Sequence, residues 1–158
     1  MAYELKVDGM TEISELLSKM EAAAPAIASE ALYEGAGVMS TEINTAAATI
    51  RTGPGSTREE ARYATPEEKA AVLSVGAGIA KFSKSGTEVD TSVGYRNAGY
   101  IDIKGKRKPI PLIVNSINSG TSFMHKQPFV RKAAKSGGAK AMGVMKAFIE
   151  DAFEKMTK

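Results

Sequence analysis

The 158-residue chain has no cysteine, no tryptophan and only one histidine, His125. Without cysteine, disulfide bonds, zinc–thiolate sites and cysteine catalysis are excluded. No apolar run approaches the roughly 20 residues that a membrane-spanning helix needs. The N-terminal segment carries acidic Glu4 and lacks the apolar core of a signal peptide. We therefore expect a protein that is synthesised in the cytoplasm and has no membrane partner.

The single histidine is the side chain that titrates nearest to neutral pH, which makes it the first candidate for catalysis. A catalytic histidine needs a nucleophile or a paired carboxylate, and the sequence has no Gly-x-Ser-x-Gly motif. The glycines of Gly76-Ala77-Gly78 lack the Gly-Lys-Ser/Thr ending of a phosphate-binding loop. We predict no enzyme activity, no cofactor and no metal. A structural or interface role for His125 is favoured, and a small hydrolase that uses His125 is a distant alternative.

The composition that remains is typical of a globular chain. Hydrophobic residues make up 43% and charged residues 25%, and the length fits a single domain over 1–158. Aromatic residues are only 6%, so alanine, glycine and methionine supply much of the apolar content. Such small side chains fit closely packed helices or a core that partner subunits complete. The net charge of +3 is too weak by itself to indicate nucleic acid.

The spacing of apolar residues predicts the elements of the N-terminal half. Alternation over 3–7 predicts a half-buried strand, and helical spacing predicts a helix from Thr11 to about Ala24. Pro25 then suits the first turn of a second, longer helix over about 25–50.

A flexible loop is predicted over about 51–65, since it contains Gly53-Pro54-Gly55. The run Thr65-Pro66-Glu67-Glu68 ends this loop with a helix start, because it offers a cap, a first-turn proline and acids near the positive helix end. We expect Arg62 and the acids of this helix start to be solvated.

The next segment is rich in residues that favour strands. Runs over 87–95 and 100–104 predict two strands, with a hairpin turn over 96–99. A basic loop over about 104–109 follows. The segment 111–119 is ambiguous between a buried strand and a short helix, and the helix is favoured.

Pro128 opens the last predicted element, a C-terminal helix over about 128–156. We expect Phe129 to anchor this helix in the core. Pro128, Phe129 and Arg131 are therefore the candidates for a core anchor or an interface. The run Ser136-Gly137-Gly138 is expected to break or kink the helix.

The basic loop contains Lys104, Lys106, Arg107 and Lys108. Four such charges give a salt-sensitive, sequence-independent attraction to phosphates. Tyr95 and Tyr100 are the nearby aromatic residues for base stacking, which is few for a single-strand platform. A solvated loop tip is favoured, and a loop that faces DNA is the alternative.

The order of short motifs along the chain is more telling than any one of them. Val7-Asp8-Gly9-Met10 comes first, and the long alanine-rich helix ends in Ile50-Arg51-Thr52-Gly53. Val93-Gly94 follows, and then Gly120-Thr121-Ser122 and Gln127-Pro128-Phe129-Val130-Arg131-Lys132-Ala133. This order resembles the gene-product-10-like family of tailed phages. Its members are tail-completion or head–tail joining (neck) proteins, related to the minor tail protein Z group.

The resemblance implies an α+β fold, in which a small antiparallel or mixed β-sheet is packed by the helices over about 25–50 and 128–156. It also implies a structural virion protein in the neck or tail of the particle. Such subunits form a homo-oligomeric, six-fold ring between a head-side connector and the tail tube or its terminator. DNA passes through the lumen without sequence specificity. The alternative is a nucleic-acid-binding accessory protein that uses the basic loop over 104–108.

Overall fold

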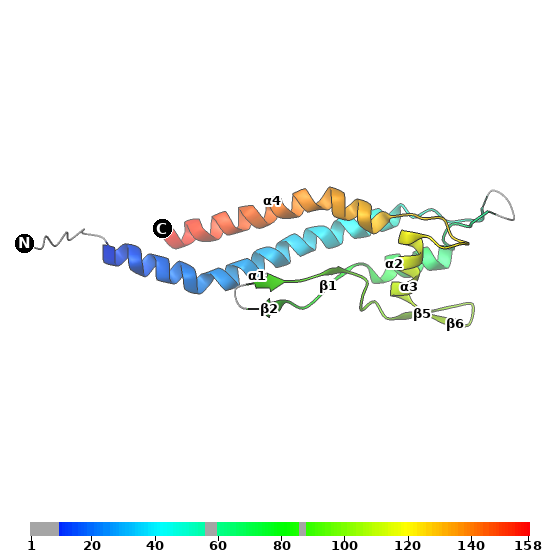
Figure 1. The fold of residues 1–158 in the computed structure, drawn as a ribbon, viewed down its shortest axis with the longest axis horizontal. Helices are drawn as coiled ribbons and strands as arrows, with labels where there is room; N and C mark the ends of the chain where they lie inside the picture. The colour runs from blue at the N-terminus through cyan, green and yellow to red at the C-terminus, as the bar shows by residue number, and fades with distance from the viewer. Residues whose placement is uncertain (1–9, 56–59, 86–87) are drawn as a thin grey trace, which may run out of the picture.

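Two long helices dominate the computed structural model, which describes residues 10–55, 60–85 and 88–158. Helix α1 (Met10–Ala48) has 39 residues and α4 (Phe129–Thr157) has 29. They pack side by side along the long axis of the molecule (Figure 1). A long helix over about 25–50 and a C-terminal helix were predicted from the sequence, whereas the strand predicted over 3–7 lies outside the described residues.

The described chain between these helices forms two shorter helices and six short strands. The helices are α2 (Pro66–Val75) and α3 (Ile110–Ser119). The strands are β1 (Gly78–Ile79), β2 (Ser83–Ser85), β3 (Glu88–Asp90), β4 (Val93–Gly94), β5 (Tyr100–Ile103) and β6 (Lys106–Pro109). They form the antiparallel pairs β1–β4, β2–β3 and β5–β6. The class is α+β, as predicted, and its β part consists of these separate pairs.

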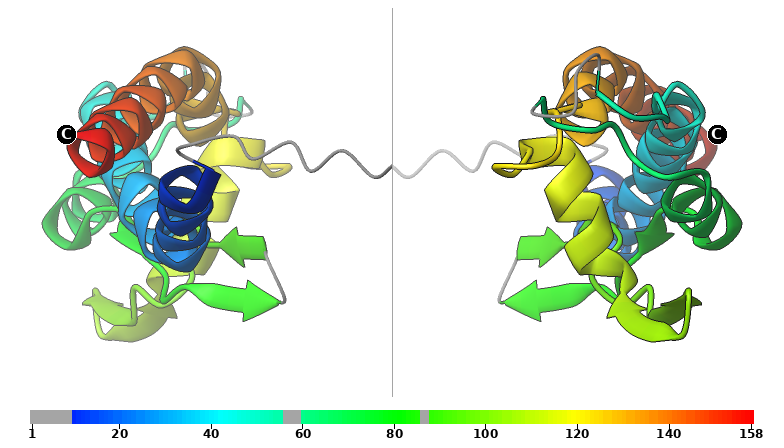
Figure 2. Two further views of the ribbon diagram at one scale, coloured as in Figure 1. Left: turned by 90° about the vertical axis from the view of Figure 1, so that its left-hand side faces the viewer. Right: turned by 90° about the vertical axis from the view of Figure 1, so that its right-hand side faces the viewer.

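Helix α1 lies between α4 on one side and the strands on the other, as the views along and across the long axis show (Figures 1 and 2). Within the described residues, no helix is both long enough and apolar enough to cross a membrane.

The prediction that one helix ends before Pro25 is wrong, because α1 runs through this proline without interruption. The proline ring fixes a φ angle that lies in the helical range, so the chain can stay helical through this residue. The hydrogen bond that proline cannot donate leaves the carbonyl of Glu21 free. Glu21 and Pro25 are both exposed, so water can satisfy that carbonyl.

A break or kink was predicted at Ser136-Gly137-Gly138, and the break is wrong. Helix α4 is continuous there, and Gly137 is buried. A Cβ at Gly137 would lie 2.9 Å from Cγ of Glu42 and 3.0 Å from Sδ of Met39. Gly137 therefore serves the close approach of α4 to α1, which outweighs the loss of helix propensity at glycine.

The predicted hairpin turn over 96–99 is wrong as well. Strand β4 pairs with β1, and β5 pairs with β6 across a turn at Lys104 and Gly105. Both turn residues have positive φ, 52° and 75°, which is the backbone of the tight turns that best match strand twist. The predicted basic loop is therefore the turn and second strand of a hairpin. The short helix predicted over 111–119 is confirmed as α3.

The core lies at one end of the molecule, where α2, α3 and β5 meet the end of α1 and the start of α4. Its buried cluster contains Ile43, Ala47, Ile50, Ala64, Val72, Ala77, Tyr95, Ile103, Ile110, Ile113, Val114, Ile117, Met124, Phe129 and Ala133. The other end is a bare pair of helices. None of the side chains over 14–30 or 142–158 is buried.

Candidate functional site

Glu68 is the buried charge around which the core end of the molecule is organised. It lies in the first turn of α2 and is only 4% exposed. The Thr65 hydroxyl accepts from the Glu68 amide at 3.1 Å, and Oε2 of Glu68 accepts from the Thr65 amide at 2.9 Å. This reciprocal pair is a capping box, which satisfies two amides that the helix start leaves free.

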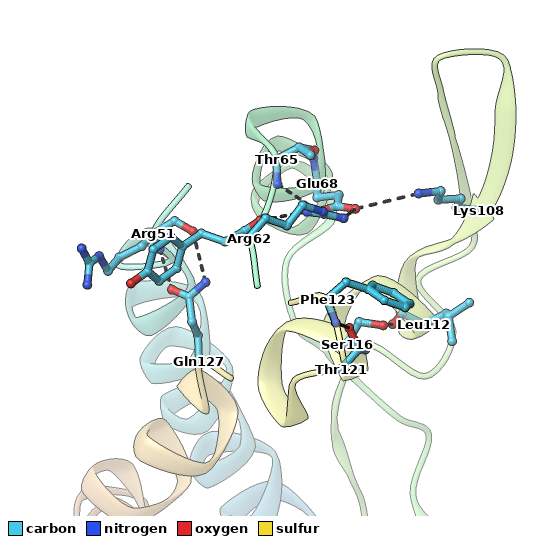
Figure 3. Close-up of polar contacts among 11 residues, drawn as sticks. Arg51, Arg62, Thr65, Glu68, Lys108, Leu112, Ser116, Thr121, Phe123 and Gln127 are labelled. Atoms are coloured by element: carbon cyan, nitrogen blue, oxygen red, sulfur yellow. Dashed lines mark hydrogen bonds and ion pairs between the residues drawn. The ribbon is translucent and has the colours of Figure 1, made fainter. Parts of the chain in front are cut away.

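Arg62 neutralises this buried carboxylate. Its two terminal nitrogens donate to the Glu68 oxygens at 2.9 and 3.0 Å, and Nζ of Lys108 lies 3.8 Å from Oε1 (Figure 3). Burial on its own raises the pKa of Glu68. The hydrogen bonds from Arg62 and the Thr65 amide, with the charges of Arg62 and Lys108, outweigh burial and lower the pKa below its ordinary value. The expectation that Glu68 is solvated is wrong, whereas Arg62 is partly exposed.

The backbone of Arg62 is hydrogen-bonded to the segment that precedes α4. Its amide donates to the carbonyl of Phe123 at 2.9 Å, and its carbonyl accepts from the amide of His125 at 2.8 Å. Thr121 and Met124 exchange backbone hydrogen bonds of 3.0 and 3.3 Å, which close a tight turn. Phe123 lies within this turn and is 68% exposed. The Glu68–Arg62 pair therefore fixes the chain that carries His125 and presents Phe123 to solvent.

His125 is half-buried beside Tyr63, with ring centroids 4.8 Å apart. The guanidinium carbon of Arg51 lies 4.6 Å from the centre of the same Tyr63 ring. These three side chains form a stack next to a surface depression of about 340 Å³. His125 thus contacts an aromatic ring, and no cluster of metal-ligating residues is found in the described part of the chain.

The other predicted site residues fall in two places. Phe129 is 4% exposed, and its ring meets that of Tyr95 edge-on at 6.3 Å. Pro128 occupies the N-cap position of α4 and lines the depression, whereas Arg131 is exposed on the helix. Pro128, Phe129 and Arg131 were all candidates for a core anchor or an interface, and of the three only Phe129 is buried in the core.

The basic residues of the β5–β6 hairpin divide into two pairs. Lys108 faces Glu68. Lys104, the other member of this pair, lies near Glu67. Hydrogen bonds at the start of α2 lower the pKa of Glu67, and the charge of Lys104 lowers it further. Lys106 and Arg107 are exposed, and the guanidinium of Arg107 lies 4.6 Å from the centre of the Tyr100 ring. The hairpin therefore directs part of its charge towards the acids of α2.

Sequence reasoning missed the partnership of Arg62 with Glu68 and the stack on Tyr63. The spacing Thr65-x-x-Glu68 is a capping-box pattern and could have indicated that this acid turns back onto the helix start. No local pattern indicates that Arg51, Tyr63 and His125 meet, because they come from three different segments.

A comparison with protein-family models, with curated proteins and with solved structures finds no match.

Proposed function

We propose that this protein is a structural virion protein of a tailed phage or prophage, a neck or tail-completion subunit. In this role six copies form a ring that joins the head-side connector to the tail tube or tail terminator and leaves a channel for DNA. The protein acts by geometry and not by catalysis. The motif order described above suggests the family, and one feature of the fold supports assembly.

That feature is the bare helix pair at the end away from the core. Gly35 of α1 faces Met145 of α4, and Glu42 faces Gly137, so the helices are antiparallel and the first turns of α1 extend past the end of α4 (Figure 1). Within the described chain, this part of α1 has no other element against it. An isolated helix pair can bury only one stripe of each helix.

Apolar side chains outside that stripe remain accessible on the bare helix pair. Leu17 is 60% exposed, and Met142 and Val144 are 64% and 39% exposed. Full burial of one such side chain is worth about 1.5–3 kcal/mol, so a neighbouring subunit that covers several of them gains appreciable free energy. Repeated head-to-tail contacts of one kind close a ring when their rotation allows it.

The experiment is native mass spectrometry with negative-stain microscopy of the purified protein and of Leu17→Glu. We expect rings from the wild type and fewer or none from the variant, because the charge cannot be covered by a neighbour. Ser18→Glu is the matched control, since Ser18 is exposed one position along and should tolerate the charge. A strict monomer that cannot join connectors or tails when these are supplied would reject the proposal.

The alternative is a nucleic-acid-binding accessory protein that uses the hairpin over 104–108. The stacking of exposed Arg107 on Tyr100 favours it, because both groups are available to a ligand. DNA affinity that survives the replacement of Lys106, Arg107 and Lys108 by alanine would reject this role for the hairpin.

A further inference from the structure

The depression between the end of α1 and the start of α4 is lined by cations, and no carboxylate is among the described residues that line it. Its volume is about 340 Å³. The lining residues are Ala46, Thr49, Ile50, Arg51, Tyr63, His125, Lys126, Gln127, Pro128, Phe129 and Lys132. Three of them are permanently positive, namely Arg51, Lys126 and Lys132. None of these three forms an ion pair with any residue in the described ranges.

The cations sit on backbone that the fold holds in place. The Gln127 side chain accepts from the Arg51 amide at 2.7 Å and donates to the Arg51 carbonyl at 3.1 Å (Figure 3). The Gln127 amide also donates to the carbonyl of Ile117 at 2.8 Å, which fixes the backbone next to Lys126. Lys132 lies in the first turn of α4, where its amide donates to the carbonyl of Pro128 at 3.0 Å. The backbone positions of the three cations are therefore held by hydrogen bonds among the segment after α1, the 120–127 segment and α4.

Arg51 is the most constrained of the three side chains. Its guanidinium stacks on Tyr63, which in turn stacks with His125. The guanidinium carbon lies 4.6 Å from the centre of the Tyr63 ring. A guanidinium beside an aromatic ring can still present its fork of N–H groups to two oxygens of a phosphate. The stack thus orients a phosphate-binding group without using its donors.

The start of α4 adds to the positive potential of the depression. A helix start carries a partial positive charge, and α4 has no acidic residue in its first turn to offset it. Pro128 and Phe129 at this start line the depression, so the helix dipole and the side chains act on the same space. Fixed positive charge from several elements, with no acid among the lining residues, is the chemistry of an anion site.

We propose that this depression binds phosphate groups of a DNA backbone, through Arg51, Lys126 and Lys132. All three residues are exposed, so they can reach a polymer that passes over the surface. DNA as the ligand rests on the proposed function, in which DNA passes through the ring. Phosphate contacts carry no sequence information, so binding will be independent of sequence.

The test measures binding of a short, mixed-sequence DNA duplex by fluorescence anisotropy over a series of salt concentrations. The variant is the triple Arg51→Gln, Lys126→Gln, Lys132→Gln. The matched control, Lys104→Gln, Lys106→Gln, Arg107→Gln, removes the same charge from the β5–β6 hairpin. We expect the first triple to weaken binding at least about tenfold. Because each phosphate contact contributes about 0.9 to the slope of log K against log salt, that slope should fall by roughly two to three.

The control triple should keep most of the affinity and most of the slope. Equal losses in the two triples would mean diffuse attraction by net charge, and a loss confined to the control triple would place DNA on the hairpin. Either result overturns the proposal, as does a wild type that does not bind DNA. Inorganic phosphate is titrated in parallel. Saturable phosphate binding with no DNA binding would overturn DNA as the ligand.

Circular dichroism of both triples checks their folding, and Lys126→Gln alone, at an exposed side chain, gives a milder variant with a slope change of about one. Ring formation is measured separately by native mass spectrometry. If all variants form rings and bind DNA as the wild type does, the depression is not the DNA-binding site, but the proposed ring function stands. If the protein is a monomer whose DNA binding depends on the three cations, the depression is the binding site, but the proposed ring function is rejected.

Discussion

Replacement of Glu68 by glutamine should destabilise the protein far more than its position in a first helical turn suggests. Glu68→Gln keeps one oxygen that can accept from the Thr65 amide, but it removes the charge that pairs with Arg62. Hydrogen bonds to a charged group contribute about 1.5–3 kcal/mol. Breaking a fully buried pair costs more, about 3–5 kcal/mol, because the remaining charge stays buried.

The exposure of Arg62 decides which of these two free-energy costs applies to Glu68→Gln. The Arg62 side chain is 36% exposed, whereas that of Glu68 is 5% exposed. Water can therefore hydrate the Arg62 charge once Glu68 is neutral, and the lower range applies. We expect the free energy of unfolding to fall by about 2 kcal/mol.

Urea denaturation followed by circular dichroism measures this difference, through the midpoint at an unchanged slope. Glu67→Gln is the matched control, since Glu67 is exposed one residue earlier, and we expect little change from it. The double variant Glu68→Gln with Arg62→Gln completes a cycle. The coupling should be about 1 kcal/mol or more, because the two side chains share direct hydrogen bonds.

The pH dependence gives the same pair a second test. The pKa of Glu68 is lowered in the folded protein, so its contribution to stability is complete above the ordinary glutamate pKa of 4.5. It is lost as the pH falls through the lower folded pKa. The wild type should therefore lose more stability in acid than Glu68→Gln does. Equal acid profiles, or a Glu68→Gln protein as stable as the wild type, would refute the reasoning.

The remaining predictions concern the core and the helix pair. Phe129→Ala should cost about 3–5 kcal/mol in urea denaturation, since Phe129 is buried against Tyr95; a near-neutral effect would mean that Phe129 does not anchor α4. Gly137→Val should lower the thermal midpoint, because the new valine side chain would collide with Glu42 and Met39. Its control is Gly138→Ala, whose methyl group would face open space and should raise the free energy of unfolding by about 1 kcal/mol. Tyr95→Phe should be neutral or stabilising, because the buried Tyr95 hydroxyl has no hydrogen-bond partner in the described chain. Burial raises the pKa of Tyr95 to about 12, so the wild type, unlike Tyr95→Phe, should lose stability between the ordinary value of 10.0 and 12.

The sequence alone indicated the features that depend on neighbouring residues. The cap at Thr65 with Pro66 after it, the apolar spacing of α3 and the long C-terminal helix each follow from backbone preferences over a few turns. Such preferences do not depend on where the rest of the chain lies. The burial of Phe129 was also predicted locally, from an apolar residue directly after Pro128 at the helix start.

Tertiary structure decided every feature in which distant segments meet. The local sequence predicted interruptions at Pro25 and Gly137, yet both helices are continuous. At Pro25 water can hydrate the carbonyl that loses its hydrogen bond, and at Gly137 the missing side chain allows α4 to approach α1 closely. The strand pairs could not be assigned from sequence, because very short strands carry little pattern and their partners are chosen by the packing.

The two charge clusters show this most clearly. From the sequence, Glu68 is expected to be a solvated acid beside Glu67. In the fold, the loop before α2 places Arg62 next to it, and this pairing offsets the free-energy cost of burying the carboxylate. Arg51, Lys126 and Lys132 are ordinary surface cations in the sequence. They become a single positive depression because the Gln127 side chain joins the end of α1 to the start of α4. The sequence determined the local helix signals and the charges that each segment carries, and the fold decided which charges share one space.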